Sequence, residues 1–323
     1  MIGGEQAFDR DWYSFFKGAL MLKGTLLYLA QNDTVRNFVI HNRTARGVSR
    51  RFVAGETVDD AIEATRVLNQ RGIHVSLDHL GENVTDAKEA MTTAQDYIAI
   101  LDRIKQAGVD ANISIKLTAL GLDISQELCE QNVSRILEHA QSLPIFVRID
   151  MEGSVYTEQT VDITLRMHQR FEHVGTVIQS CLHRSKKDVE ELIAQGVRVR
   201  LVKGAYKEPA EVAFQQKSEV DQNYVRLMMP LLLHGNYPAI ASHDEAIINA
   251  TCKFARDNGI DKASFEFQML YGIRRDLQEK LVGQGYNMRV YVPYGSQWYP
   301  YMMRRMAERP ANLVFVMSNA VRR

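Results

Sequence analysis

The sequence predicts a (β/α)8 barrel of the TIM type, preceded by an N-terminal helical arm. Two observations carry this prediction: short apolar runs alternate with helical segments from Gly72 onward, and eight such runs fit within about 240 residues. Continuous apolar strands separated by helices favour a parallel sheet that is covered on both faces. A doubly wound open sheet is the alternative. We therefore divide the 323 residues into an arm, 1–60, and a catalytic barrel, 61–323.

The arm has a helical pattern. Apolar residues between Trp12 and Leu29 approximate one wide helix face, and a later helical segment is expected to end near Gly72. The most apolar stretch, 18–30, is interrupted by Lys23 and is too short to span a bilayer. We expect this face to pack against the barrel, and peripheral membrane contact is its alternative use.

The barrel elements follow from apolar runs and from helix start and stop signals. Several helical segments open on Thr, Ser or Asp and close near Gly, as helices commonly do. The expected strands are 73–77, 111–117, 145–149, 175–178, 197–202, 239–241, 264–267 and 289–292. The expected helices are 85–107, 123–141, 157–173, 186–196, 210–233, 245–258 and 273–284.

Composition excludes several classes of protein. Lys plus Arg is 39 and Asp plus Glu is 39, so zero net charge gives no electrostatic reason to expect nucleic acid as a partner. Cys129, Cys181 and Cys252 are widely separated, which fits a reducing cytosol and no structural zinc or other metal. No secretory signal pattern precedes the arm, so we expect a cytoplasmic protein. The one Gly-x-Gly, 283–285, follows a helix and precedes a strand, which is the wrong context for a dinucleotide turn.

Polar side chains concentrate where the expected strands end. Active sites of such barrels lie at the C-terminal ends of the strands, where packing alone predicts few charges. The polar residues there are Asp78, His79, Lys116, Asp150, Glu152, Gln179, Arg200, Lys203, Tyr206, Ser242, His243, Asp244, Gln268 and Tyr291. Because nearly every expected strand ends in a polar or charged residue, we predict a binding site at this end of the barrel.

Some of these residues have specific expectations. A guanidinium such as that of Arg200, buried in an apolar strand, needs a partner, and Asp150 or Glu152 is the candidate. Two roles are open for Lys116: a functional role in the site, or a structural ion pair with an acid on a neighbouring strand. The turn 203–206 is more specific, because its Gly and Ala let a ligand approach the backbone and its amides suit an anion.

A helix expected to end at Pro310 carries two adjacent arginines. Tyr301 lies one turn before Arg304 and Arg305, so the three share a surface. Paired guanidinium forks suit a carboxylate or a phosphate. The alternative is that these arginines form only a solvated basic face of the helix, with Glu308 as the ion-pair partner of Arg304.

Four segments together resemble the proline dehydrogenase family. They are Arg148-Ile-Asp-Met-Glu152, Arg200-Leu-Val-Lys-Gly-Ala-Tyr206, 265–272 and 301–309, and they occur in order along nearly the whole chain. The resemblance implies a distorted (β/α)8 barrel that binds FAD without a Rossmann motif. It also implies oxidation of L-proline to Δ1-pyrroline-5-carboxylate, the first step of proline degradation to glutamate, by hydride transfer from proline C5 to flavin N5.

The resemblance also implies residue roles. Asp150 and Arg200 match catalytic positions. The substrate-binding positions are Lys116, Arg304 and Arg305 for the carboxylate, and Leu201, Tyr206, Leu270, Tyr291 and Tyr301 around the ring. The FAD-binding positions are Met151, Gln179, Arg200, Lys203, Gly204, Ala205, Ser242 and His243. Ser242 replaces a frequent Thr and keeps the hydroxyl, whereas Asp244 replaces Asn in some relatives and receives no flavin contact.

The resemblance further implies a monofunctional bacterial-type enzyme, with no fused aldehyde dehydrogenase, that passes electrons to a membrane quinone. Localisation is then cytoplasmic, with peripheral contact on the inner face of the membrane. Tyr291 would crowd a ring hydroxyl, which favours proline over hydroxyproline.

Three other functions stay open from the residues alone. A Schiff-base lyase or aldolase would use Lys116 or Lys203 as nucleophile. A non-catalytic ligand-binding barrel leaves the strand-end charges unexplained. A metal-dependent hydrolase could use 78–79 or 243–244, but no HxH or HExxH spacing occurs.

Overall fold

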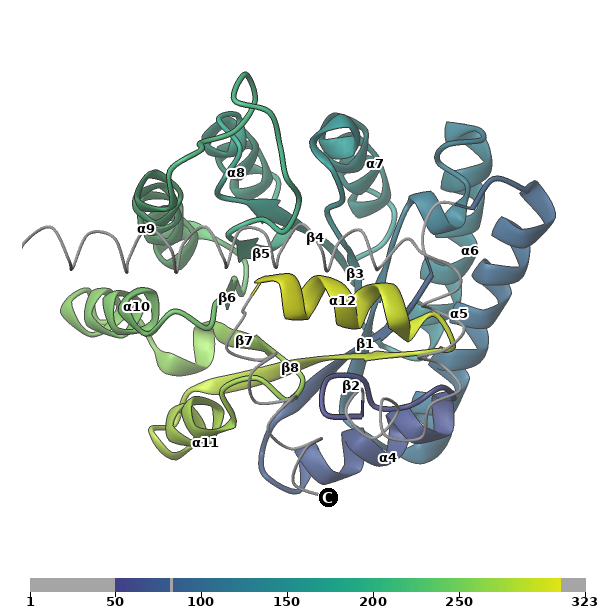
Figure 1. The fold of residues 1–323 in the computed structure, drawn as a ribbon, viewed down its shortest axis with the longest axis horizontal. Coiled ribbons are helices and arrows are strands. Elements are labelled where there is room, and N and C mark those ends of the chain that lie inside the picture. Colours follow the sequence, from purple (N-terminus) through teal and green to yellow (C-terminus); the bar gives the residue numbers. More distant parts are fainter. Residues whose placement is uncertain (1–49, 82–83, 309–323) are drawn as a thin grey trace, which may run out of the picture.

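Eight parallel strands close into a barrel in the order β1 to β8, with β8 returning to pair with β1 (Figure 1). The computed structural model describes residues 50–81 and 84–308. The barrel prediction is confirmed and the open-sheet alternative is wrong. Within the described residues the strands are β1 (His74–His79), β2 (Ala111–Ile115), β3 (Val147–Ile149), β4 (Val174–Gln179), β5 (Arg198–Val202), β6 (Ala239–Ala241), β7 (Glu266–Leu270) and β8 (Asn287–Tyr294).

Helices surround the barrel and one more crosses it. In Figure 1, α5 to α11 form the outer ring and α12, in yellow, lies across the barrel. The helices are α4 (Val58–Asn69), α5 (Ala87–Ala107), α6 (Gln126–Ser142), α7 (Thr157–His168), α8 (Ser185–Ala194), α9 (Lys217–His234), α10 (Glu245–Asp257), α11 (Arg275–Gly283) and α12 (Trp298–Glu308). Short 3-10 turns are η1 (Thr118–Leu120), η2 (Ser154–Tyr156) and η3 (Lys262–Ser264).

The hydrophobic core lies between the strands and the ring of helices. Alternate strand residues point in opposite directions, so Val147 and Ile149 of β3 pack outward while Arg148 between them faces the barrel interior. The inward residues of several strands are polar or charged. Barrel interiors are usually filled by branched apolar side chains, so this interior is organised differently.

Helices begin and end at several of the capping residues that the sequence predicts. The side chain of Thr57 caps α4 in a capping box with Asp60, and Asp86 and Ser125 cap α5 and α6. The Gly-x-Gly at 283–285 ends α11 and enters a left-handed turn, as expected.

Several predicted boundaries differ from the structure, and two of them have clear local causes. The helix expected from Ala210 begins at Lys217, because Gln216 caps it and the preceding segment instead forms a bridge between Ala213 and Leu182. The strand expected from Ser264 begins at Glu266, because η3 occupies the residues before it.

Residues 54–56 fix the connection between β8 and α12. The Ala54 amide donates to the Pro293 carbonyl at 2.9 Å, and the Gly295 amide donates to the Gly55 carbonyl at 2.9 Å. The indole of Trp298 donates to Glu56 at 3.3 Å. These bonds hold the start of α12 at the barrel.

The expected arm falls almost entirely outside the described residues, including the apolar stretch 18–30. The expected boundary at residue 60 falls inside α4, which packs against β1 and β8. None of the helices formed by the described residues has the length and apolarity needed to cross a bilayer.

Candidate active site

A cavity of about 440 Å³ opens at the C-terminal ends of the strands, and α12 forms part of its wall. Every predicted catalytic and cofactor-binding residue lines it. The lining residues are Asp78, Lys116, Asp150, Met151, Val177, Gln179, Arg200, Val202, Lys203, Gly204, Ala205, Tyr206, Lys217, Ala241, Ser242, His243, Asp244, Gln268, Met269, Leu270, Tyr291 and Tyr301.

The centre of the cavity is a buried ion pair. Arg200 Nη1 donates to Asp150 Oδ1 at 2.8 Å, and the Tyr291 hydroxyl donates to the other oxygen of Asp150 at 2.7 Å. Arg200 Nη2 donates to the hydroxyls of Ser114 at 3.2 Å and Ser76 at 3.4 Å. Burial and the nearby Asp150 carboxylate raise the pKa of Tyr291 well above its ordinary value, so this phenol remains a donor.

Asp150, and not Glu152, is therefore the partner of Arg200. Glu152 accepts hydrogen bonds from the backbone amide of Thr118 at 3.1 Å and from its hydroxyl at 2.5 Å. The Gln179 side-chain amide donates to the Glu152 carbonyl at 2.9 Å. Glu152 thus connects η1 to the segment after β3 and fixes the orientation of Gln179.

Lys116 forms a buried ion pair with Asp78 on the neighbouring strand β1. Burial raises the pKa of Asp78, and the charge of Lys116 opposes this rise. The predicted pairing of Lys116 with an acid on a neighbouring strand is thus confirmed, and Lys116 also lines the cavity. Asp78 is one of the polar residues at the strand ends, but it is not among the predicted catalytic, substrate-binding or cofactor-binding residues.

Lys203 is held by two carboxylates at the cavity wall. Its Nζ lies 2.5 Å from Asp221 Oδ1 and 2.7 Å from Asp244 Oδ2. The hydrogen bond from Lys203 lowers the pKa of Asp244 to about 2. Asp244 also caps α10 by accepting from the Ala246 amide at 3.1 Å, so it ties Lys203 to that helix.

The backbone after Lys203 requires glycine. Gly204 has φ +116°, and a Cβ there would lie 2.4 Å from Cys181 Sγ and 3.2 Å from Gln179 Oε1. With Ala205 following, the main chain itself forms this part of the wall, as expected from the sequence.

His243 is oriented by the neighbouring strand. Its Nε2 accepts a hydrogen bond from the Leu270 amide at 2.9 Å, so the proton of the neutral ring is on Nδ1. The hydroxyl of Ser242 accepts a hydrogen bond from the Asp244 amide at 3.1 Å. Both side chains line the cavity beside Lys203.

The predicted substrate residues are only partly brought together. Tyr206, Leu270, Tyr291 and Tyr301 line the cavity with Lys116. Leu201 does not line it, contrary to the prediction. It is fully buried, and strand alternation directs it away from the face that carries Arg200 and Val202. The side chains of Arg304 and Arg305 lie outside the described part of the structure, although α12 runs through both positions.

Comparisons with known proteins show which family the chain is similar to. The family model described as Proline dehydrogenase matches residues 61–318. The chain is 41% identical to Proline dehydrogenase 2 of Bacillus subtilis over 92% of this chain and 97% of that protein. It is 42% identical to Proline dehydrogenase of Deinococcus radiodurans over 85% and 90%, respectively.

A solved structure is also similar in fold. The proline utilization A protein of Bdellovibrio bacteriovorus matches with a TM-score of 0.77 at 24% identity. The match covers 88% of this chain and 38% of that longer chain. The likeness therefore concerns one part of the larger protein.

Proposed function

The chain belongs to the proline dehydrogenase family and is an enzyme that oxidises proline, and on this premise we propose how its strand-end cavity holds cofactor and substrate. The observation that carries the proposal is the single cavity that joins the Asp150–Arg200 pair, the backbone after Lys203 and Tyr301 of α12.

We propose FAD as the cofactor. Gln179, Ser242 and His243 offer amide, hydroxyl and imidazole groups to the polar edge of a flavin, and Lys203 offers a positive charge to its phosphates. The glycine-dependent backbone at Gly204 leaves room for close approach. The Nε of Arg200 is buried without a hydrogen-bond partner, which leaves one donor for a bound group. FAD supplies the two-electron acceptor for the hydride of proline C5, which no side chain can provide.

We propose that proline lies between these residues and α12. Tyr206, Leu270, Tyr291 and Tyr301 surround the ring, and their place in one cavity supports this role. Lys116 takes part in binding the carboxylate together with Arg304 and Arg305, which follow Tyr301 by about one helical turn. This arrangement fixes the ring by its carboxylate and orients the opposite carbon for reaction.

The proposed catalytic contribution of the chain is electrostatic. Arg200 would place a fixed positive charge beside the flavin, which would gain negative charge on accepting the hydride. Asp150 and Tyr291 hold that guanidinium in position. Proline binds with its nitrogen unprotonated, so that its lone pair expels the hydride without a strong base. The product is Δ1-pyrroline-5-carboxylate.

We further propose that a membrane quinone receives the electrons, and that the protein is cytoplasmic with peripheral membrane contact through residues 18–30. The support is the apolar helical pattern of that stretch, interrupted only by Lys23.

The alternative of a Schiff-base lyase is less favoured by the site. Nucleophilic lysines are activated by apolar or cationic surroundings, whereas Lys116 and Lys203 are both paired with carboxylates.

A visible spectrum tests the proposal. The purified protein is expected to show flavin absorbance bands that bleach when L-proline is added without oxygen. A colourless protein that FAD does not reconstitute would contradict it. Borohydride trapping of a carbonyl substrate on either lysine would instead favour the lyase.

A further inference from the structure

A second cavity, of about 450 Å³, opens at the opposite end of the barrel, where the strands begin. Four basic and two acidic side chains line it, so its surface carries an excess of positive charge. The charged lining residues are Lys105, Arg148, Arg198, Arg289, Asp110 and Glu266. None of them belongs to the strand-end site described above.

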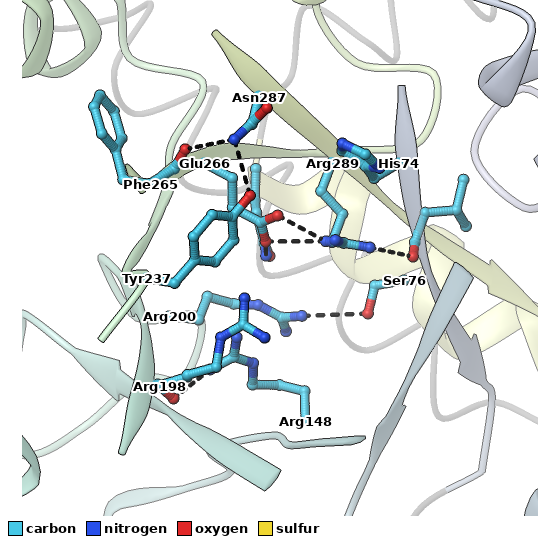
Figure 2. A network of polar contacts seen from close by, with 12 residues as sticks. His74, Ser76, Arg148, Arg198, Arg200, Tyr237, Phe265, Glu266, Asn287 and Arg289 are labelled. Atoms are coloured by element: carbon cyan, nitrogen blue, oxygen red, sulfur yellow. Dashed lines mark hydrogen bonds and ion pairs between the residues drawn. The ribbon is translucent and has the colours of Figure 1, made fainter. Parts of the chain in front are cut away.

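Two arginines lie at the same level of the barrel on either side of a glycine. Arg148 of β3 is in register with Gly175 of β4, which is in register with Arg198 of β5. A Cβ on Gly175 would lie 2.9 Å from Arg148 Nη1 and 2.3 Å from the Arg198 carbonyl. Because Gly175 has no side chain, the guanidinium of Arg148 can lie beside it. Figure 2 shows the side chains of Arg148 and Arg198 close together in the barrel interior.

Arg148 is buried, with 2% of its surface exposed, and none of the described carboxylates forms an ion pair with it. Its Nη1 donates to the carbonyls of Thr176 at 2.9 Å and Arg198 at 2.6 Å, and its guanidinium lies 4.7 Å from the ring centre of Phe146. Its Nε is buried without a hydrogen-bond partner. Burial and the charges of Arg200 and Arg198 lower the pKa of Arg148, and the charges of Glu266 and Asp150 oppose this lowering.

Arg198 is fixed by two aromatic rings. Its guanidinium lies 4.7 Å from the ring centre of Phe146 and 4.4 Å from that of Tyr237. Among residues 50–81 and 84–308, no carboxylate lies within ion-pair distance of Arg198, and its Nε is buried without a hydrogen-bond partner. A planar guanidinium is thereby held at the cavity wall by two rings, with its Nε donor unused.

The nearby acid does not neutralise this pair. Glu266 receives Arg289 Nε at 2.9 and 3.0 Å on its two oxygens, and Gln268 donates to it at 2.5 Å. Figure 2 shows this separate contact beside the two arginines. The side-chain oxygen of Asn112, which also lines the cavity, is buried without a partner. Buried charges are normally paired, so the unmatched arginines indicate a missing anion.

We propose that this cavity binds a small oxyanion with about two negative charges, a phosphate or a dicarboxylate, held by Arg148 and Arg198 with Lys105 at the rim. Guanidinium forks match the planar oxygen pairs of both classes, and two negative charges offset the excess of basic groups in the lining. The site is independent of the proline cavity, because the polar groups of the barrel interior separate the two ends.

Calorimetric titration of the holoenzyme with inorganic phosphate and, separately, succinate tests this site at constant ionic strength set with chloride. We expect saturable binding of at least one probe. Arg198→Gln should weaken it about tenfold or more, since a charge-assisted hydrogen bond is lost. Lys105→Gln, at an exposed rim position, should weaken it about threefold without disturbing folding.

Two further variants test whether the anion binds in this cavity and not elsewhere on the protein. Arg135→Gln removes an exposed charge on α6, where the side chain makes one 3.5 Å contact with Gln95, and should leave binding unchanged. Arg305→Met alters the proposed proline clamp and should also leave it unchanged. The probe that binds more tightly identifies the anion class. The proposal is overturned if neither probe binds saturably, if Arg135→Gln weakens binding as much as Lys105→Gln, or if Arg305→Met abolishes it. Should Arg198→Gln not fold, the result with Lys105→Gln decides.

Discussion

Arg200 on β5 reaches over the intervening strand β4 to bind Asp150, which follows β3, at 2.8 Å. The two residues are 4% and 8% exposed, so neither charge is solvated on its own. Removing one partner leaves the other charge buried and uncompensated, which typically costs about 3–5 kcal/mol. The pair is therefore a structural support of the barrel as well as part of the proposed catalytic site.

A double-mutant cycle measures this coupling. Asp150→Asn and Arg200→Met should each lower the free energy of unfolding by about 3 kcal/mol, and the double variant should lose less than the sum. Urea unfolding of the three variants and the unaltered enzyme gives the coupling energy. Additive losses would show that the pair contributes no mutual stabilisation.

Arg305→Met tests the clamp proposed on α12. The loss of a charge-assisted contact to the proline carboxylate corresponds to about 2–5 kcal/mol, so KM for proline should rise roughly 30-fold or more while bound flavin is unchanged. Arg226→Met, at an exposed position on α9, is the matched control and should leave KM unaltered. Unaltered proline kinetics in Arg305→Met would remove this residue from the clamp.

Lys203→Ala should loosen FAD more than it changes KM for proline. The substitution removes a positive charge from the cavity wall and leaves Lys217 as the remaining lysine shared by Asp221 and Asp244. Lys217→Ala is a close comparison, because Lys217 contacts the same two carboxylates but its side chain is 76% exposed. We expect a change of about 1 kcal/mol or less in FAD affinity for Lys217→Ala. Equilibrium dialysis measures the FAD affinity of both variants. If Lys203→Ala changed KM for proline more than it changed FAD affinity, Lys203 would belong to the proline site and not to the FAD site.

Acidification should remove the stabilisation that comes from Asp244. Its pKa falls from 3.8 in an unperturbed chain to about 2 in the folded protein, chiefly through the hydrogen bond from Lys203. The stabilisation is present above the unfolded pKa and is lost as the pH falls through the folded one. Asp244→Asn, which keeps a helix-capping residue, should thus cost about 2 kcal/mol at pH 6 and roughly half as much at pH 3. If the loss of unfolding free energy in Asp244→Asn were the same at pH 6 and pH 3, the ionisation of Asp244 would not be its cause.

Much of the site follows from strand polarity and alternation. Because parallel strands present their C-terminal ends together, the sequence places Asp150, Lys203 and Tyr291 at one end of the barrel, and the cavity contains all three. Alternation also explains the misplaced Leu201. It lies next to Arg200 in sequence, and adjacent strand residues face opposite sides, so only one of them can line the interior.

Other features depend on contacts between distant segments. The bridge from Ala213 to Leu182 decides where α9 begins, and the local helical pattern from Ala210 contains no signal for it. The pairing of Lys116 with Asp78 likewise depends on the strand order. The register that aligns Arg148 with Arg198 through Gly175 is a property of three strands, so the segment of either arginine alone does not predict it.

The pairing of β8 with β1 has a consequence for synthesis of the chain. His74 to His79 pair with Arg289 to Tyr294, so the barrel stays open until β8 has left the ribosome. Until then β1 and β7 present unpaired edges, which are templates for aggregation. Tyr291, which completes the contacts of Asp150, arrives on the same late strand. Ribosome-bound or prematurely terminated chains that stop before β8 are thus expected to depend on chaperones and to bind neither cofactor nor substrate.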